Sequence, residues 1–346
     1  MQIEVILEPD LTPAQVAELA VVAEGCGIRA LWHSNYYAHW DPFVTLVPAA
    51  LATRRIRLGI LAVSPYELHP LKMANSILSL NEISEGRAML AVGGGGAVLS
   101  AIGPQINHKK LRIVRGVREA LEILKSATTG QFSMGYKGDI FQVTRPHKMA
   151  WAKATPPVIY ACSTGPQMLR MGGEHADAVQ MSDIIPSMAA EAVANVREGL
   201  ARRKAPAPDF RIGNFWAWHI KQDREKSMYE ARRELVYRGE MVPPFNGLEH
   251  VLDAAEIELV KKHWLNFVKA YRTRSGVIEG VPAPLIDHLI AELSSAGDPG
   301  QIDAQLERYR QFADAGVTDL ALRLFDDPMA GLKLIAERVV PAFERA

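Results

Sequence analysis

Residues 57–96 have the sequence RLGILAVSPYELHPLKMANSILSLNEISEGRAMLAVGGGG, which predicts a strand, a helix and a second strand. Arg57 to Val63 and Ala88 to Val92 are short apolar runs of the kind that form strands buried on both faces. Between them, residues 72–83 carry apolar side chains at a helical spacing. Two buried strands joined by a helix form a right-handed unit in which the strands are parallel.

The same alternation of strand and helix continues on both sides of this unit. Further strands are expected at Ile3–Leu7, Ile28–His33, Pro157–Cys162, Ala176–Met181, Phe210–Ile220 and Asp319–Phe325. Eight strands, nearly all followed by helices, predict a (β/α)8 TIM barrel, with a doubly wound open sheet as the alternative. Residues 223–283 are helical and longer than a connection needs, so we expect an insertion after strand seven within a single domain, residues 1–346.

Composition narrows the classes of partner. The 346 residues include 39 Lys and Arg and 39 Asp and Glu, so the formal net charge is zero. This balance argues against nucleic acid or an anionic membrane as the main partner, and no apolar run is long enough to span a bilayer. Only two cysteines are present, Cys26 and Cys162, which is typical of a reducing compartment. The chain opens on a strand without a signal-peptide pattern, so we expect a cytoplasmic protein.

In such a barrel, the active site lies where the strands end. This rule selects Glu8 after strand one and the loop containing Asn35, Tyr36 and His39 after strand two. From the later strands it selects Ala62, Val63, Ser64, Gly93, Gly94, Gly95, Ser163, Thr164, Gly165, Pro166, Gln167 and Met168.

Two of these segments suit particular ligands. The four glycines at residues 93–96 allow the backbone to approach a flat ligand closely, although a flexible turn is the alternative. Residues 163–168 join a strand to a helix whose first N–H groups can hold a phosphate, although an ordinary helix cap looks similar. Neither segment matches a dinucleotide fingerprint or a P-loop.

The titratable residues near the strand ends have competing interpretations. Glu8 has two possible roles. It is either a carboxylate in an apolar mouth, which suits proton transfer, or a solvated carboxylate at the rim. His33, His39 and His69 have no carboxylate or cysteine at tight metal-ligand spacing, so no metal site is predicted.

Several motifs resemble the luciferase-like monooxygenase superfamily. The run from Val63 to Pro70 (VSPYELHP) followed by residues 80–87 (LNEISEGR) is similar to the pattern T-N-P-Y-T-R-H-P … L-D-E-L-S-G-G-R. That pattern is found in the branch of coenzyme F420-dependent reductases that includes methylenetetrahydromethanopterin reductase. Residues 165–169 (GPQML) and 173–177 (GEHAD) resemble G-P-K-M-L … G-E-I-A-D of the same branch.

The resemblance implies a reduced flavin or deazaflavin at the barrel mouth, F420 first and FMN as the alternative. It places residues 62–64 at a bulge behind the ring, where the family often has a non-proline cis peptide, here expected between Leu61 and Val63. It places Gly93 to Gly95 at the ring border and Ser163 to Met168 at the phosphate. Asn35-Tyr36 replaces the Asp-His pair common in F420-binding relatives, and Gln167 replaces a common Lys. Tyr36, His33 or His39 is then the candidate substitute for the missing histidine.

Four functions follow, in order of preference. The first is an oxidoreductase that transfers a hydride between F420 and a small organic substrate, with Glu8 or Tyr36 managing the proton. The second is an FMNH2-dependent monooxygenase supplied by a partner flavin reductase. The third is a non-catalytic flavin-binding protein, and the fourth is a sugar-phosphate barrel enzyme without flavin. The resemblance also implies a homodimer formed through helices beside strands two and three.

Overall fold

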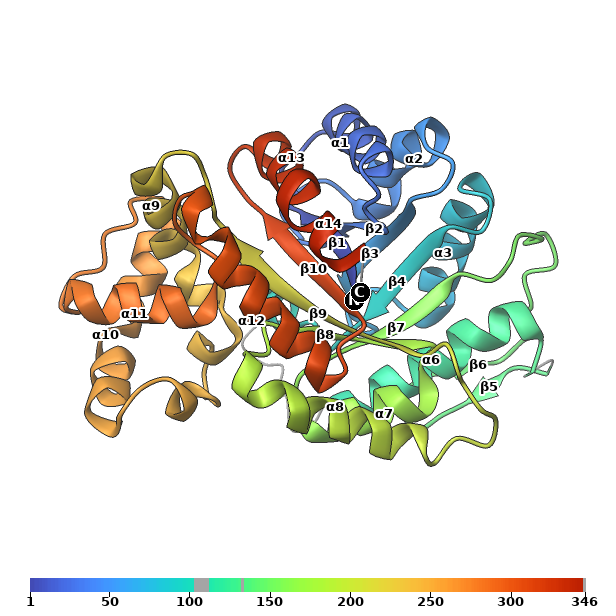
Figure 1. Ribbon diagram of the computed structural model, residues 1–346. Coiled ribbons are helices and arrows are strands. Elements are labelled where there is room, and N and C mark those ends of the chain that lie inside the picture. The colour runs from blue at the N-terminus through green and yellow to red at the C-terminus, as the bar shows by residue number, and fades with distance from the viewer. Residues whose placement is uncertain (103–111, 132–133, 345–346) are drawn as a thin grey trace.

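The computed structural model, which describes residues 1–102, 112–131 and 134–344, is a closed barrel of eight parallel strands surrounded by helices (Figure 1). The order around the barrel is β1-β10-β9-β8-β7-β4-β3-β2. The barrel strands are β1 (Gln2–Leu7), β2 (Ala30–Ser34), β3 (Arg57–Val63), β4 (Ala88–Val92), β7 (Val158–Ser163), β8 (Ala178–Ser182), β9 (Arg211–Trp218) and β10 (Asp319–Leu324). The predicted (β/α)8 barrel is confirmed, and the open sheet is excluded because β1 pairs with β10.

All eight strands lie within two residues of their predicted bounds, and at two of the ends the hydrogen bonds show the local reason for the difference. β2 begins at Ala30 because the N–H of Ile28 still donates to the carbonyl of Ala23 at the end of the preceding helix. β9 ends at Trp218 because the N–H of His219 donates to Ser295 O, which turns the chain away from the barrel.

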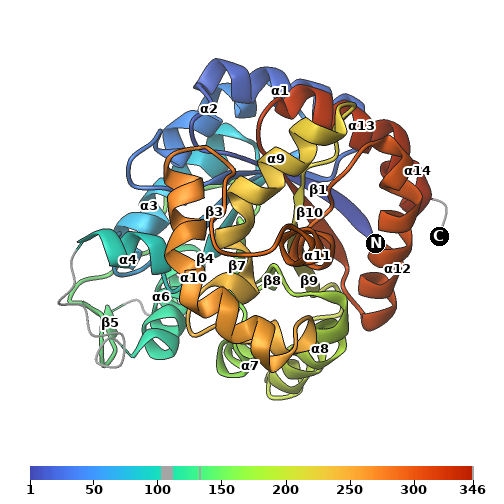
Figure 2. The same cartoon turned by 90° about the vertical axis from the view of Figure 1, so that its left-hand side faces the viewer.

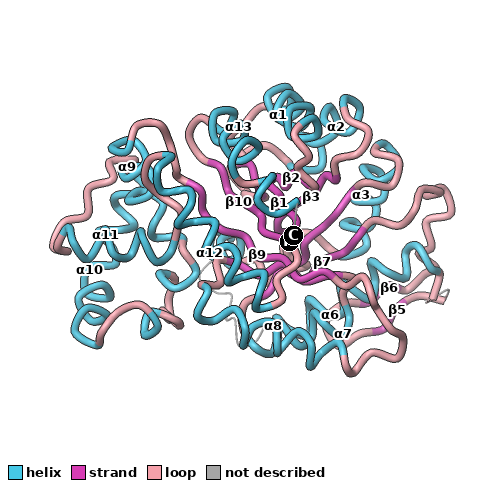
Figure 3. Tube along the Cα trace, viewed as in Figure 1, coloured by secondary structure: helices cyan, strands magenta, loops and turns pink. Residues whose placement is uncertain are grey.

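The surrounding helices begin at residues that suit helix starts (Figure 3). Thr12 and Gln15 form a capping box at the first helix, and Asp41 accepts from two backbone N–H groups at the second. These helices are α1 (Pro13–Gly25), α2 (Pro42–Ala52), α3 (Pro70–Ile83), α6 (Ile113–Thr129), α7 (Pro166–His175), α8 (Pro186–Leu200), α12 (Ile302–Ala315), α13 (Pro328–Arg338) and α14 (Val340–Glu344). A short helix, α4 (Gly96–Ile102), follows β4, and a hairpin of β5 (Tyr136–Lys137) and β6 (Gln142–Val143) follows α6.

Two apolar cores hold the barrel together. The larger core fills the space between strands and helices, and the smaller one fills the barrel interior with Ile6, Trp32, Tyr160, Phe215 and Ala321 among its members. Because side chains alternate along a strand, a residue two positions after an interior one points to the same side. At the end of each strand, the residues that lie two positions after an interior side chain therefore face the mouth of the barrel.

Between β9 and β10 the chain forms a helical layer that lies over one end of the barrel (Figure 2). Its helices are α9 (Arg224–Glu234), α10 (Ala254–Arg272) and α11 (Ala283–Leu293), with 3-10 turns η1 (Leu235–Tyr237), η2 (Gly239–Met241), η3 (Leu248–His250) and η4 (Pro299–Gln301). Asp253 and Glu256 form a capping box at the start of α10. Among the described residues, no helix has the length and apolar character needed to cross a bilayer.

Candidate active site

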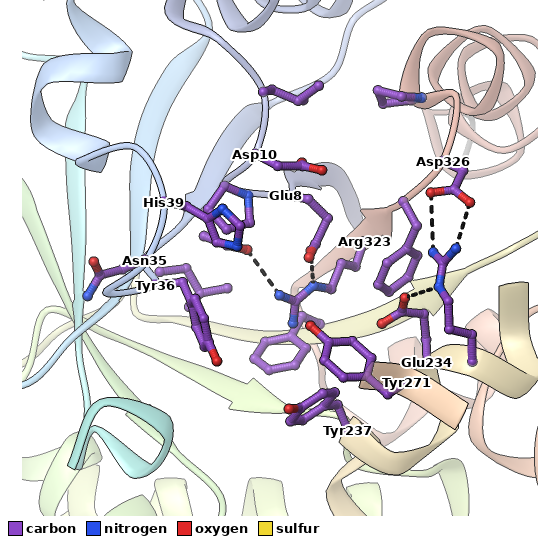
Figure 4. Close-up of a pocket in the computed structure, with 18 of the residues that line it drawn as sticks. Glu8, Asp10, Asn35, Tyr36, His39, Glu234, Tyr237, Tyr271, Arg323 and Asp326 are labelled. Carbon is purple, nitrogen blue, oxygen red and sulfur yellow. Dashed lines mark hydrogen bonds and ion pairs between the residues drawn. The ribbon is translucent and has the colours of Figure 1, made fainter. Parts of the chain in front are cut away.

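A cavity of about 490 Å³ lies between the carboxyl ends of the strands and the helical layer (Figure 4). Figure 4 shows Glu8 and Arg323 meeting near its centre, with Asn35, Tyr36 and His39 on one side. Its size is within the range of small-molecule sites. The cavity lies at the carboxyl ends of the strands, which is where barrel enzymes have their active sites.

Two small residues, Ala62 at the end of β3 and Cys162 at the end of β7, line part of the cavity, and Gly93 after β4 packs behind them. A Cβ placed on Gly93 would lie 3.3 Å from Cys162 Cβ and 3.5 Å from Ala62 Cβ, so these three residues are packed side by side. The Leu61–Ala62 peptide bond is cis, as the resemblance predicts, and the pairing of β3 with β4 is irregular there. Burial raises the pKa of the Cys162 thiol to about 12, which keeps it neutral. Ala62 and Cys162 therefore give this part of the cavity a small, uncharged lining.

An ion pair at the ends of β1 and β10 forms the opposite, polar side. Arg323 Nε donates to Glu8 Oε1 at 2.6 Å, and Arg323 Nη2 donates to Ser34 Oγ at 3.2 Å. The guanidinium also lies 5.8 Å from the centroid of the Phe325 ring. Burial opposes the charge on Arg323, but Glu8 and further carboxylates outweigh it and raise the pKa of the guanidinium. Arg323 therefore fixes Glu8 in the cavity.

The helical layer supplies a second charged group to the cavity. Arg233 Nε donates to Glu234 Oε1 at 2.7 Å, and Arg233 Nη1 donates to Asp326 Oδ2 at 2.8 Å. Burial raises the pKa of Glu234, and Arg233 acts against that rise. Tyr237 and Tyr271 pack edge to face with their ring centroids 4.5 Å apart. These contacts join the helical layer to the segment that follows β10.

A buried acidic cluster lies at the end of β8, and two of its members, Asp183 and Arg238, line the cavity. Arg238 Nη1 donates to Asp183 Oδ1 at 3.0 Å, and both side chains are almost fully buried. Burial raises the pKa of Asp183, and Arg238 acts against that rise. Glu240 is buried close by, and its Oε2 has no hydrogen-bond partner within the described residues. One arginine thus faces two buried carboxyl groups, so we expect one of the two carboxyl groups to keep its proton.

The loop after β2 brings three predicted residues to the cavity. Asn35 is held by its side-chain amide, which donates to Ala62 O at 3.0 Å and to Glu67. The Tyr36 ring lies 5.5 Å from the His39 ring, and burial raises the pKa of the Tyr36 hydroxyl, so it stays protonated. His39 is exposed at the rim, whereas His33 is fully buried and does not line the cavity.

The remaining predicted residues lie beside the cavity rather than on its lining. Val63 and Ser64 are buried, and Ser64 Oγ donates to Gly94 O at 3.3 Å. Gly95 has a φ of +80°, and a Cβ there would collide with Ser64 Cβ. The backbone conformation and the lack of space therefore both require glycine at this position.

The expected phosphate segment begins α7 with its first turn open. Ser163 is buried and its hydroxyl donates to Met168 O at 3.3 Å, so it faces its own helix. Thr164, Gly165, Pro166 and Gln167 are exposed, and no side chain caps the helix.

Sequence reasoning selected Asp183 by its place after a strand, but it missed the arginines of the cavity and the acids Glu234 and Asp326. Arg323 had a usable signal, because it occupies the last inward position of a strand that is otherwise apolar after Asp319. Arg233, Glu234, Tyr237 and Tyr271 gave no such signal, because their place depends on how the helical layer packs. Within the described ranges, no cluster of three or more His, Cys, Asp or Glu side chains could hold a metal ion.

Comparison with known proteins places this architecture in a family. In sequence, the chain is 28% identical over 336 residues to the 5,10-methylenetetrahydromethanopterin reductase of Archaeoglobus fulgidus, covering 96% of this chain and 97% of that protein. The coenzyme F420-dependent tetrahydromethanopterin reductase of Methanopyrus kandleri has a similar structure, with a TM-score of 0.78, 24% identity and 99% of both chains covered. The oxygenating constituent of 3,6-diketocamphane monooxygenase from Pseudomonas putida, in complex with FMN, has a TM-score of 0.66, 21% identity and 99% coverage of both chains. These two structures share the fold. The profile of the luciferase-like monooxygenase family matches residues 2–319, and the protein belongs to that family.

Proposed function

We propose that the protein is an oxidoreductase that transfers a hydride between bound coenzyme F420 and a small organic substrate at the barrel mouth. The observation that carries this proposal is a single cavity that Ala62 and Cys162 line together with the Glu8–Arg323 ion pair. A planar ring needs space beside small side chains, and a proton-handling group is needed in the same cavity. The sequence similarity to a methylenetetrahydromethanopterin reductase over nearly the whole chain supports F420.

The residues present fit a deazaflavin. Ala62 and Cys162 are small side chains on the cavity lining, where larger side chains would take up the space of a planar ring. Val63, Ser64, Gly94 and Gly95 would support the ring border from behind. The open first turn of α7, residues 164–168, would receive the phosphate through its free backbone N–H groups. When bound, the deazaflavin would supply the hydride chemistry.

The chain's own side chains would position the substrate and move the proton. Glu8 is fixed by Arg323 and lies in the cavity, where its carboxylate can accept or hold a proton. Tyr36 keeps its hydroxyl proton and can donate a hydrogen bond from the opposite side. His39 lies next to Tyr36 at the rim, where it can exchange protons with solvent. Tyr237 and Tyr271 of the helical layer help to exclude water.

Side-by-side titration with F420 and FMN, followed by absorbance and tryptophan quenching, tests this proposal. We expect micromolar or tighter binding of F420 and much weaker binding of FMN, and then turnover with a member of a substrate panel. The reverse preference, with oxygen consumption when a flavin reductase supplies FMNH2, would favour the monooxygenase. Tight F420 binding without turnover would favour a flavin-binding protein, and binding of neither would reject a flavin function.

We also propose that the protein is a cytoplasmic homodimer. Apolar side chains are exposed on the helices beside β2 and β3, namely Val44 and Leu51 of α2 and Ile83 of α3. A hollow between α2 and α3 lies among them. Exposed apolar patches of this kind mark contact surfaces. Cys26 and Cys162 are both free thiols, which supports a reducing compartment.

A further inference from the structure

Asp183, the residue after β8, lines the candidate active site but has no part in the function proposed above. Its Oδ1 accepts from Arg238 Nη1 at 3.0 Å. Its Oδ2 accepts no hydrogen bond from the described residues, and it is not an enclosed atom. The small exposed part of Asp183, 2% of the residue, therefore includes Oδ2, which opens to the cavity.

Glu240 belongs to the helical layer and is buried close to Asp183. A Cβ on Gly239 would lie 3.4 Å from Asp183 Cβ, so η2 packs directly on the end of β8. Glu240 is 3% exposed, and its Oε2 has no hydrogen-bond partner among the described residues. A buried carboxylate oxygen without a donor costs free energy that a protonated carboxyl group does not. Glu240 is therefore more stable in this position with its proton than without it.

The charged groups that face these two carboxyl groups separate their protonation states. Burial raises the pKa of Asp183, while Arg238 and Arg323 act against that rise. Burial raises the pKa of Glu240 to about 8, with Asp183 adding to the rise and Arg238 opposing it. At neutral pH the two carboxyl groups thus hold one proton between them. The proton rests on Glu240, because both arginines favour the charged form of Asp183.

We propose that Asp183 is a second proton-transfer residue of the cavity, beside Glu8, and that Glu240 holds the proton that Asp183 delivers. This inference rests on the hydride transfer proposed above. Two proton sites suit that reaction, because the hydride donor and the hydride acceptor each exchange a proton.

The steps balance in atoms and charge. When one substrate atom accepts the hydride, Asp183 passes the proton of Glu240 through Oδ2 to the neighbouring substrate atom, whose double bond becomes a single bond. The hydride donor loses its own proton to Glu8, and solvent returns a proton to Glu240. In the opposite direction, Asp183 accepts the proton that the substrate loses as its hydride leaves.

Infrared difference spectroscopy tests the shared proton without any turnover. We expect a carbonyl band of a protonated carboxyl group at about pH 6 that is lost at about pH 10. Glu240→Gln and Asp183→Asn should each lack this band, because either carboxyl group alone faces Arg238 as a carboxylate. The matched controls Glu258→Gln and Asp287→Asn, at exposed positions, should keep it. A spectrum that is the same in all five proteins would overturn the proposal, whether or not the protein binds F420.

Kinetics with a substrate from the panel test the delivery of the proton. Asp183→Asn should lower kcat for substrate reduction by at least about 100-fold and leave the F420 affinity unchanged. In the unaltered protein kcat should fall as the pH rises past about 8, where Glu240 loses its proton. Glu240→Gln should move this fall to lower pH by at least about one unit, and Glu240→Asp should restore it. An Asp183→Asn variant as active as Asp287→Asn, or an unmoved profile in Glu240→Gln, would overturn the proposal. Failure of the unaltered protein to bind F420 would instead reject the proposed function.

Discussion

Gly93 packs behind the two small residues that line the cavity, and a Cβ there would lie 3.3 Å from Cys162 Cβ and 3.5 Å from Ala62 Cβ. We predict that Gly93→Val weakens F420 binding by at least about tenfold, because the branched side chain would push Ala62 and Cys162 toward the ring. Fluorescence titration measures the affinity, and thermal denaturation checks the fold. Gly25→Val is the control, because nothing lies within 4 Å of a Cβ at Gly25. Unchanged affinity in a folded Gly93→Val protein would contradict the proposed ring position.

Arg323 acts on the chemistry through Glu8. We predict that Arg323→Met lowers kcat/KM on the substrate found in the panel by about 100-fold, because Glu8 loses the donor that fixes it. Arg323→Lys should recover part of this loss, since a lysine restores the charge but not both hydrogen bonds. Steady-state kinetics over a pH series measures both variants. Arg310→Met, at an exposed position on α12, is the control, and an Arg323→Met variant that is as active as this control would show that Glu8 needs no partner.

Glu240 makes the stability of the protein depend on pH. Burial, with Asp183 acting in the same direction, raises the pKa of Glu240 from its ordinary value of 4.5 to about 8. The folded state therefore holds a proton that the unfolded state releases. The stability contributed by the protonated group is complete below pH 4.5 and is lost as the pH rises toward about 8.

The matching prediction concerns Glu240→Gln, which keeps the neutral form at every pH. Between pH 6 and pH 8 the free energy of unfolding should fall in both proteins. The fall should be smaller in Glu240→Gln than in the unaltered protein, and the difference should be about 2 kcal/mol. Urea denaturation at the two pH values measures this difference. Glu258→Gln, at an exposed position, should behave as the unaltered protein does. Parallel pH dependence in all three proteins would show that Glu240 is ionised throughout.

At the scale of elements, the helical layer is attached to the barrel through Arg233 on α9. This arginine is buried and pairs with both Glu234 and Asp326, the latter from the segment after β10. We predict that Arg233→Met destabilises the fold by about 2–4 kcal/mol, because Glu234 stays buried without its partner. Urea denaturation measures the loss. Arg272→Met, at an exposed position on α10, should cost far less, and equal losses would show that the pair does not hold the layer.

The elements themselves differ in how local their causes are. α1, α2 and α10 begin at side chains that cap them within three residues, so the sequence pattern is sufficient to place them. The end of β9 depends instead on Ser295, which is distant in sequence and accepts the N–H of His219. Strand ends of this kind cannot be placed from local residues.

At the scale of the whole molecule, the exposed apolar face of α2 is the strongest sign of self-association. Val44 is 64% exposed and Leu51 is 62% exposed. We predict that Val44→Asp combined with Leu51→Asp converts the proposed dimer to a monomer, because two carboxylates would be buried without partners at the proposed interface. Light scattering after gel filtration measures the mass. Leu265→Asp, 72% exposed on α10, is the control, and an unaltered protein that already has the monomer mass would reject the dimer.

The sequence by itself determined the barrel, because each strand and helix is encoded by nearby residues through periodicity, caps and glycines. It also directed attention to the mouth, where Glu8, Asn35, Tyr36, His39 and Ala62 line one cavity. Only the tertiary structure decided which charges meet there. Arg323 reaches Glu8 across 315 positions of sequence, and Arg238 reaches Asp183 across 55. Such pairs depend on the closure of the barrel and on the packing of the helical layer. Both are long-range arrangements of whole elements, and no local pattern in the chain records them.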